Sequence, residues 1–145
     1  MKFLFKPLDT MEEWLWFKDK THVLRCEDSQ GIMAYNEQGI IQAAAIFDSF
    51  SPDGCSVHWA IENPMVLRHK FLQAIAYHLF VTCKRERIFG LVPSNNTKAL
   101  KFDHNVGMRE VARIPHAMGE GIDYIIMTMT KAECRWLPEE LREVT

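Results

Sequence analysis

Several features that mark other protein classes are missing from this chain of 145 residues. The four cysteines lie far apart with no CxxC or CxxH pair, so the ligand spacing of a zinc site is absent and reduced thiols are expected. No apolar run reaches the length of a membrane span, and the apolar core of MKFLFKPLD is too short for a signal peptide. We therefore expect a cytoplasmic protein with no metal and no membrane partner.

An excess of charge is missing as well. The chain has 17 basic and 19 acidic residues and a formal net charge of -2. Proteins that neutralise nucleic-acid phosphates are usually strongly basic, so nucleic acid is not an expected partner. The strongest argument against that view is a set of basic residues in the middle of the chain: Arg68, Lys70, Lys84, Arg85 and Arg87.

No internal repeat, low-complexity tract or linker divides the chain. Apolar residues make up 48% and charged residues 25%, which is typical of soluble globular proteins. A chain of this length suits one hydrophobic core, so we expect a single domain over residues 1–145.

Short apolar runs bounded by turn signals predict seven strands. The segment Asn36-Glu37-Gln38-Gly39 is a hairpin turn between the second and third of them. The expected strands are Lys2–Leu8, Gly31–Tyr35, Ile40–Phe47, Cys55–Ile61, Arg87–Val92, Arg109–Ile114 and Tyr124–Thr130.

Helices are predicted between these strands. Thr10 and Glu13 have the spacing of a capping box, and the aromatic stretch Trp14–Phe17 that follows is expected to pack in the core and at its rim. From Pro64 to Cys83 an apolar residue recurs every four positions, which predicts one long helix. A short helix is expected from Asn96 to Gly107, and the tail KAECRWLPEELREV is read as a helical end.

The resulting order is β-α-β-β-β-α-β-α-β-β. Hairpins make the first strands antiparallel, and the helix after Cys55–Ile61 is a crossover that should place Arg87–Val92 beside it in parallel. We therefore predict an α+β (mixed α/β) fold with a mostly antiparallel sheet of about seven strands and helices on both faces.

The stretch VPSNNTKALKFDHNVGM contains the junction between the expected strand Arg87–Val92 and the short helix that follows it. Ser94, Asn95 and Asn96 stand where the helix begins. Such side chains cap the first free N–H groups of a helix. A junction with exposed N–H groups is also a site for an anionic ligand, and the sequence leaves both interpretations open.

This stretch, together with the element order, resembles the GNAT superfamily of acetyl-CoA-dependent N-acetyltransferases. Many members have Asn, then x-x-Ala, an apolar-basic-aromatic triplet, and a glycine that ends the helix. Here the same spacing is given by Asn96, Ala99, Leu100-Lys101-Phe102 and Gly107. The resemblance covers roughly residues 31–130. It implies a parallel pair that splays apart and a pantetheine arm that pairs with the edge of SVHWAIENP, at Trp59 and Ile61.

The chain departs from the family at the pyrophosphate loop. The usual Arg/Gln-x-x-Gly-x-Gly/Ala motif is replaced by NPMVLRHKFL, which has no glycine. This is similar instead to small acetyltransferase-like proteins of bacteriophages and to the ribosomal-protein acetyltransferase type, with a basic cluster at the helix start. The resemblance implies phosphate contacts from Val66, Arg68, His69, Lys70 and Phe71, with Asn96 on the pantetheine arm. Alternatively, the basic residues simply face solvent.

A second departure concerns the acid that protonates the leaving thiolate. The family's frequent Tyr falls on Asp103, and an ordinary Asp (pKa ~3.9) would be ionised at neutral pH. Ser94 is a nearby substitute and Tyr124 a more distant one. For the base, the resemblance implies His58 on the fourth strand or Glu62 at its end, although a strand histidine can also be purely structural.

The function implied is transfer of an acetyl group from acetyl-CoA to an amine, either a small molecule or a protein N-terminus. The alternative is a catalytically weakened or inactive GNAT-fold binding protein, of phage origin and acting in the host cytoplasm through protein interaction. The acceptor amine is not identified by the sequence, and a homodimer is left open. Four scattered acids could attract a cationic amine: Asp48, Asp53, Glu120 and Asp123.

Overall fold

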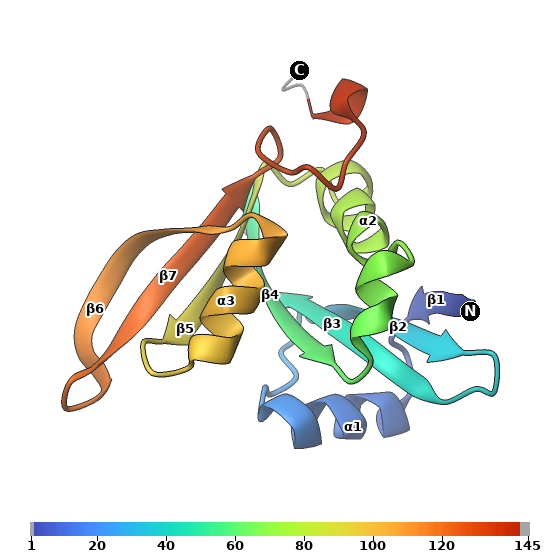
Figure 1. Cartoon of the computed structure of the whole chain (residues 1–145), viewed down its shortest axis with the longest axis horizontal. Coiled ribbons are helices and arrows are strands. Elements are labelled where there is room, and N and C mark those ends of the chain that lie inside the picture. The colour runs from blue at the N-terminus through green and yellow to red at the C-terminus, as the bar shows by residue number, and fades with distance from the viewer. Residues whose placement is uncertain (1, 143–145) are drawn as a thin grey trace.

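Seven strands form one sheet in the computed structural model, which describes residues 2–142 (Figure 1). The order across the sheet is β1-β2-β3-β4-β5-β7-β6, and neighbours are antiparallel except β4 and β5, which are parallel. The strands are β1 (Phe3–Pro7), β2 (Gln30–Asn36), β3 (Ile41–Asp48), β4 (Gly54–Ile61), β5 (Arg87–Pro93), β6 (Arg109–Gly119) and β7 (Ile122–Thr130). The predicted α+β sheet and its single parallel pair are confirmed.

Helices cover both faces of this sheet, as predicted (Figure 1). Side chains alternate between the faces along a strand, and β3 shows this clearly. Ala44 and Ile46 pack with Trp14 and Phe17 of α1 (Met11–Thr21). Residues on the other face of β3 join the core under α2 (Phe71–Ala76) and α3 (Thr97–Val106), which therefore lie opposite α1.

The capping box at the start of α1 is confirmed. Thr10 Oγ1 accepts a hydrogen bond from Glu13 N, and Glu13 Oε1 accepts one from Thr10 N, each at 3.1 Å. Trp14 and Phe17 are buried, as expected for a core-facing aromatic stretch. The start of α1 is thus capped by hydrogen bonds between neighbouring residues of its own sequence.

The single helix predicted over residues 64–83 is wrong. The structure has a 3₁₀ helix at Pro64–Arg68, a left-handed residue at Lys70 (φ 73°), α2, and a π-helical segment at Tyr77–Thr82. An α-helix has 3.6 residues per turn, so an apolar repeat of four drifts off the buried face. The wider π turn corrects that drift. It keeps six residues buried together: Phe71, Leu72, Ile75, Ala76, Leu79 and Phe80.

The C-terminal helix is also wrong. Turns occupy most of the segment after β7, and its only helical part within residues 2–142 is a 3₁₀ turn at Glu139–Leu141. Pro138 lacks the N–H that a continuing helix would need. Trp136 instead donates from Nε1 to Val106 O at 2.8 Å, while Cys134 and Leu137 are buried. The segment is therefore a packed strap over the end of α3.

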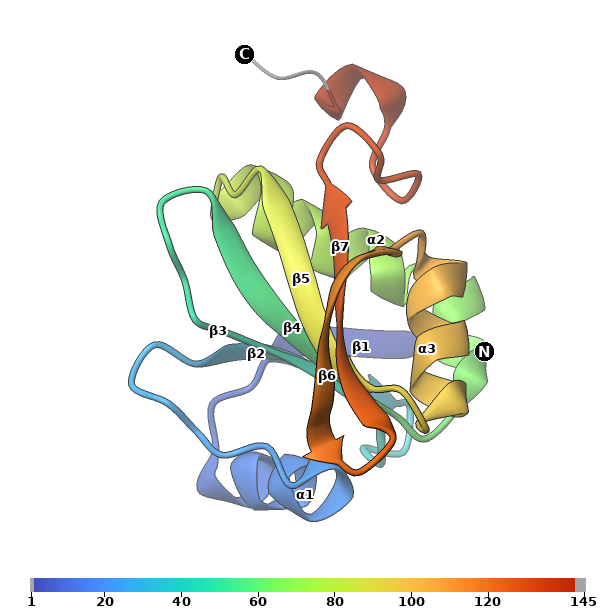
Figure 2. The same cartoon turned by 90° about the vertical axis from the view of Figure 1, so that its left-hand side faces the viewer.

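The β6–β7 hairpin is longer than predicted, because β6 continues to Gly119 rather than ending at Ile114 (Figure 2). Every residue of β6 is exposed, so the apolar alternation that marks a half-buried strand fades along it. The last part of the strand therefore has no apolar pattern by which it could be predicted.

The pairing of β4 with β5 is short. Only Gly54–Ser56 and Arg87–Phe89 are in register, after which the two strands diverge (Figure 1). The predicted splayed pair is therefore confirmed, and it divides the sheet into a β1–β4 half and a β5–β7–β6 half. Within residues 2–142, no helix has the length and apolar character needed to cross a membrane.

Candidate active site

A cleft of about 700 Å³ occupies the gap where β4 and β5 diverge. Its walls come from four elements, so residues far apart in the sequence meet there. They are Lys20–Val23 at the end of α1, Val57–Glu62 of β4, Gly90–Val92 of β5, and Asn96, Lys98, Ala99, Phe102 and Asp103 at the start of α3.

The main chain of β4 presents free hydrogen-bonding groups to this cleft. Glu62 N donates to Gln42 O of the β3 side at 3.0 Å, and the β3–β4 register is regular. Bonded and non-bonded pairs alternate in an antiparallel ladder. The N–H and C=O groups of Trp59 and Ile61 therefore point away from β3, toward the gap that β5 has left, beyond the last β4–β5 pair at Ser56 and Phe89.

The wall on the α3 side is apolar. The rings of Trp59 and Phe102 meet edge to face with centroids 5.3 Å apart, and Val92 and Ala99 continue the same surface. Trp59 and Ile61, predicted to contact a pantetheine arm, thus lie at an unpaired strand edge beside an apolar wall.

His58 lies on the opposite side of β4, facing the α1 side of the sheet. Its Nε2 is 3.0 Å from Asp48 Oδ2 and 3.2 Å from Ser56 Oγ. Asp48 is only 5% exposed, and His58 lines the cleft. Sequence reasoning identified His58 but not the partners that hold it, because the pairing of Asp48 opposite Ser56 depends on strand register.

Glu62, the alternative base, is in the cleft but already paired. It forms an ion pair with Lys20 at the end of α1, which links the two walls at the cleft mouth. Ser94 is not in the cleft lining. Its Oγ accepts from Asp123 N and its N–H donates to Asp123 O, both at 2.8 Å, so Ser94 joins the end of β5 to the start of β7.

Asn96 caps α3, since its Oδ1 accepts from Ala99 N at 3.2 Å. The capping interpretation of the junction is therefore confirmed. Asn96 also lines the cleft and is exposed, so the cap residue borders the same space as the β4 edge. The two interpretations of this junction are compatible in the structure.

Asp103 differs from the ordinary aspartate expected at this position. Its side chain is in the cleft lining beside Gly90, where an added Cβ would lie 3.6 Å from Asp103 Oδ2. Asp103 is 5% exposed, and burial raises the pKa of its carboxyl to about 6. At pH 7 about a tenth of Asp103 therefore keeps its proton, far more than of an exposed carboxyl.

The residues predicted to contact phosphates follow β4 directly but lie outside the cleft lining. Arg68 and Lys70 are exposed, and Lys70 precedes α2 without a side-chain bond to its first N–H groups. His69 instead packs edge-on against Phe3, with ring centroids 5.4 Å apart. Val66 and Phe71 are fully buried, so only their main chain can reach a ligand.

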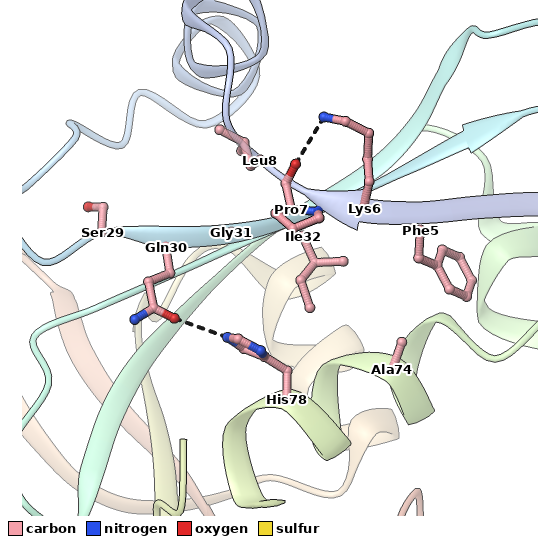
Figure 3. Close-up of a pocket in the computed structure, with 10 residues that line it drawn as sticks. All are labelled: Phe5, Lys6, Pro7, Leu8, Ser29, Gln30, Gly31, Ile32, Ala74 and His78. Carbon is pink, nitrogen blue, oxygen red and sulfur yellow. Dashed lines mark hydrogen bonds between the residues drawn. The ribbon is translucent and has the colours of Figure 1, made fainter. Parts of the chain in front are cut away.

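A second hollow, of about 430 Å³, lies between β1, the start of β2 and α2 (Figure 3). Its polar side chains are already satisfied by the protein. His78 Nε2 is 3.0 Å from Gln30 Oε1, and Lys6 donates to Pro7 O at 2.9 Å (Figure 3). The remaining walls are mostly apolar, so this hollow offers no reactive group. No cluster of three or more metal-ligating side chains occurs within residues 2–142.

Comparison with known proteins gives a match only at the level of structure. The sequence matches no family model and no curated protein. Among solved structures, the spermidine/spermine N-acetyltransferase SpeG from Vibrio cholerae superposes with a TM-score of 0.71 at 10% identity, over 88% of this chain and 92% of SpeG. A GNAT-family acetyltransferase from Bacillus anthracis superposes with a TM-score of 0.55 at 16% identity, over 69% of this chain and 65% of its own.

The chain has the GNAT fold. At these identities the likeness establishes the fold alone, and the function must be argued from the cleft. The GNAT fold of this chain brings His58, Trp59, Ile61, Glu62, Asn96 and Asp103 together at one cleft. It leaves Ser94 and the segment Val66–Phe71 outside that lining.

Proposed function

We propose that this protein is an N-acetyltransferase that moves an acetyl group from acetyl-CoA to an amine. The observation that carries the proposal is the cleft at the splayed β4–β5 pair, where an unpaired strand edge, an apolar wall and a buried carboxyl meet. The N-acetyltransferase names of structural neighbours add support at the level of fold. The proposal includes a cytoplasmic site of action, since acetyl-CoA is available to an enzyme there.

Binding would use the β4 edge. A pantetheine arm carries amides that can extend a sheet as an added strand would, and Trp59 and Ile61 would offer the matching groups. Asn96 would hydrogen-bond the same arm. The exposed cations Arg68 and Lys70 would face the phosphates in place of the missing glycines.

The chemistry would use two of the titratable groups that line the cleft, His58 and Asp103. His58 takes a proton from the attacking amine as the C–N bond forms at the acetyl carbonyl. The C–S bond then breaks, and Asp103, in its neutral form, gives its proton to the departing sulfur. At the end His58 has gained one proton and Asp103 has lost one, and exchange with solvent restores both.

A second candidate is a protein that binds acetyl-CoA without transferring the acetyl group. The observation that favours it is the packing of His69 against Phe3, which takes one side chain of the predicted phosphate-binding cluster away from a ligand in a segment that has no glycine. The first candidate accounts for more of the cleft, because binding alone requires neither His58 nor a buried Asp103.

Acetyl-CoA binding separates these candidates from a fold that has lost the ligand altogether. At a concentration 100-fold above Kd, acetyl-CoA should stabilise the protein by roughly 2.7 kcal/mol, measured as a shift in thermal midpoint. Release of free thiol in the presence of a panel of amines then tests transfer. No midpoint shift with acetyl-CoA would reject both candidates, and binding without thiol release for any amine would favour the second.

Replacing Arg68 and Lys70 together with Ala should weaken acetyl-CoA binding about tenfold or more. Two contacts between exposed cations and phosphate are lost, and each such exposed ion pair contributes up to about 1 kcal/mol. The measurement is the Kd for acetyl-CoA by calorimetry, compared with the Kd values for the desulfo and dephospho analogues of coenzyme A. A matched control is Lys18→Ala with Arg87→Ala, which removes the same charge from exposed positions on α1 and β5. Equal affinity in the two double variants would contradict a phosphate role for this cluster.

A further inference from the structure

A buried carboxylate holds His58 from the neighbouring strand. Asp48 is the last residue of β3, and its Oδ2 lies 3.0 Å from His58 Nε2. Its other oxygen, Oδ1, accepts a hydrogen bond from Ser49 Oγ at 3.3 Å, and Ser56 Oγ lies 3.2 Å from the same His58 Nε2. Within residues 2–142, the side chains that hydrogen-bond this carboxylate are thus those of His58 and Ser49.

We propose that Asp48 is a positioning residue that prepares His58 to act as the base, an inference that rests on the proposed function. An ionised carboxylate can only accept hydrogen bonds, so Nε2 must carry the proton that it shares with Asp48. The lone pair is then on Nδ1, which takes part in no hydrogen bond within residues 2–142. A fixed tautomer leaves Nδ1 free to accept a proton from an amine in the cleft.

The strand register places these groups on one face. Asp48 is opposite Ser56, and Ile46 is opposite His58, so Asp48 lies diagonally across from His58 on the α1 side. The next residues along this face, Ile46 and Ala60, are apolar and pack under α1. Burying a carboxylate beside them is unfavourable unless it is paired. Packing alone would be served better by an apolar residue at position 48.

Other charged groups of the cleft do not replace Asp48. Lys20 at the end of α1 is paired with Glu62 of β4, and His22 makes no hydrogen bond to His58. Asp103 is on α3, on the other face of the sheet. When His58 takes the amine proton on Nδ1, the resulting imidazolium lies against the Asp48 carboxylate, which stabilises it through the hydrogen bond at Nε2.

The test is a double-mutant cycle on acetyl transfer with Asp48→Asn and His58→Gln. Asn has the size of Asp but no charge, and its amide can hydrogen-bond either tautomer of His58. We expect Asp48→Asn to lower kcat about 10- to 100-fold while KM and Kd for acetyl-CoA stay within about twofold. In the His58→Gln background the same change should have no further effect. Glu37→Gln, which removes an exposed carboxylate from the turn between β2 and β3 outside the cleft lining, is the matched control and should leave kcat unchanged.

The outcomes are distinguishable from a failure of the proposed function. If the unmodified protein neither binds acetyl-CoA nor releases thiol, the function and this inference both fall. If it transfers acetyl groups and Asp48→Asn lowers kcat equally in both backgrounds, Asp48 acts through the fold and only the inference falls. An independent measurement needs no variant: nitrogen-15 spectra of the unmodified protein should show His58 protonated at Nε2, and a proton on Nδ1 would overturn the proposal.

Discussion

Asp103→Asn should raise the thermal midpoint of the protein at pH 8 and leave it nearly unchanged at pH 4. Burial raises the pKa of Asp103 to about 6 in the folded state, against about 3.8 when exposed. The folded state therefore holds this proton more tightly than the unfolded state. The associated stability is fully present below pH 4 and is lost as the pH rises through 6.

At pH 8 the ionised, buried carboxylate should cost about 3 kcal/mol, which a neutral Asn avoids. For a chain of this size the gain corresponds to roughly 10 °C in thermal midpoint. Asp19→Asn, exposed on α1, is the control and should show no such dependence on pH. The same gain at pH 4 and pH 8 would mean that Asn improves packing and that ionisation of Asp103 is not the cause.

The same variant should lose activity while it gains stability. Asn cannot give a proton to a departing sulfur, so thiol release should fall about 100-fold with acetyl-CoA affinity retained. Opposite changes in stability and turnover would distinguish a proton donor from a residue that supports the fold. Unchanged turnover would assign protonation of the thiolate to solvent.

Glu13→Gln should destabilise the protein by about 3 kcal/mol at pH 7. Glu13 is 3% exposed, and its carboxylate accepts hydrogen bonds from Lys6 Nζ at 2.7 Å, from Tyr35 Oη, and from the N–H groups of Asp9 and Thr10 at 3.1 Å. Burial alone would raise the pKa of Glu13, but these hydrogen bonds outweigh burial and lower that pKa to about 2. The cluster joins the start of α1 to β1 and β2.

The pH dependence of this effect has the opposite sign to that of Asp103. Because the folded pKa of Glu13 is depressed, its stabilisation is present above about pH 4.5 and is lost as the pH falls toward 2. Chemical denaturation across this range measures it. The adjacent Glu12→Gln is the matched control, since Glu12 is exposed and should change stability by less than 0.5 kcal/mol. Equal effects of the two substitutions would show that the Lys6–Glu13–Tyr35 cluster contributes little.

The elements that could be predicted from the sequence are those whose signals are local. The capping box at Thr10 and Glu13, the hairpin at Asn36–Gly39 and the cap at Asn96 each depend on a few adjacent residues. The parallel pair followed from one helix-length connection between two apolar runs. Such signals do not depend on what packs against the element.

The features that could not be predicted depend on long-range packing. The left-handed Lys70 breaks a continuous apolar pattern without a glycine or an internal proline to mark it. The pairing of Asp48 with His58 follows from a register that the sequence does not specify. Asp103 reads as an ordinary acid until β5 and α3 enclose it, because its pKa is set by neighbours far away in the chain.

The three-residue pairing of β4 with β5 also determines how the molecule can move. Strand pairing is the most rigid connection in a sheet, and here the two halves share very little of it. Side-chain packing makes the remaining contacts between the β1–β4 half and the β5–β7–β6 half, so only a short stretch of main-chain pairing joins the two halves. A ligand that pairs with the free edge of β4 would add hydrogen bonds beyond this short pairing, and it would connect the two halves of the sheet where β4 and β5 do not pair.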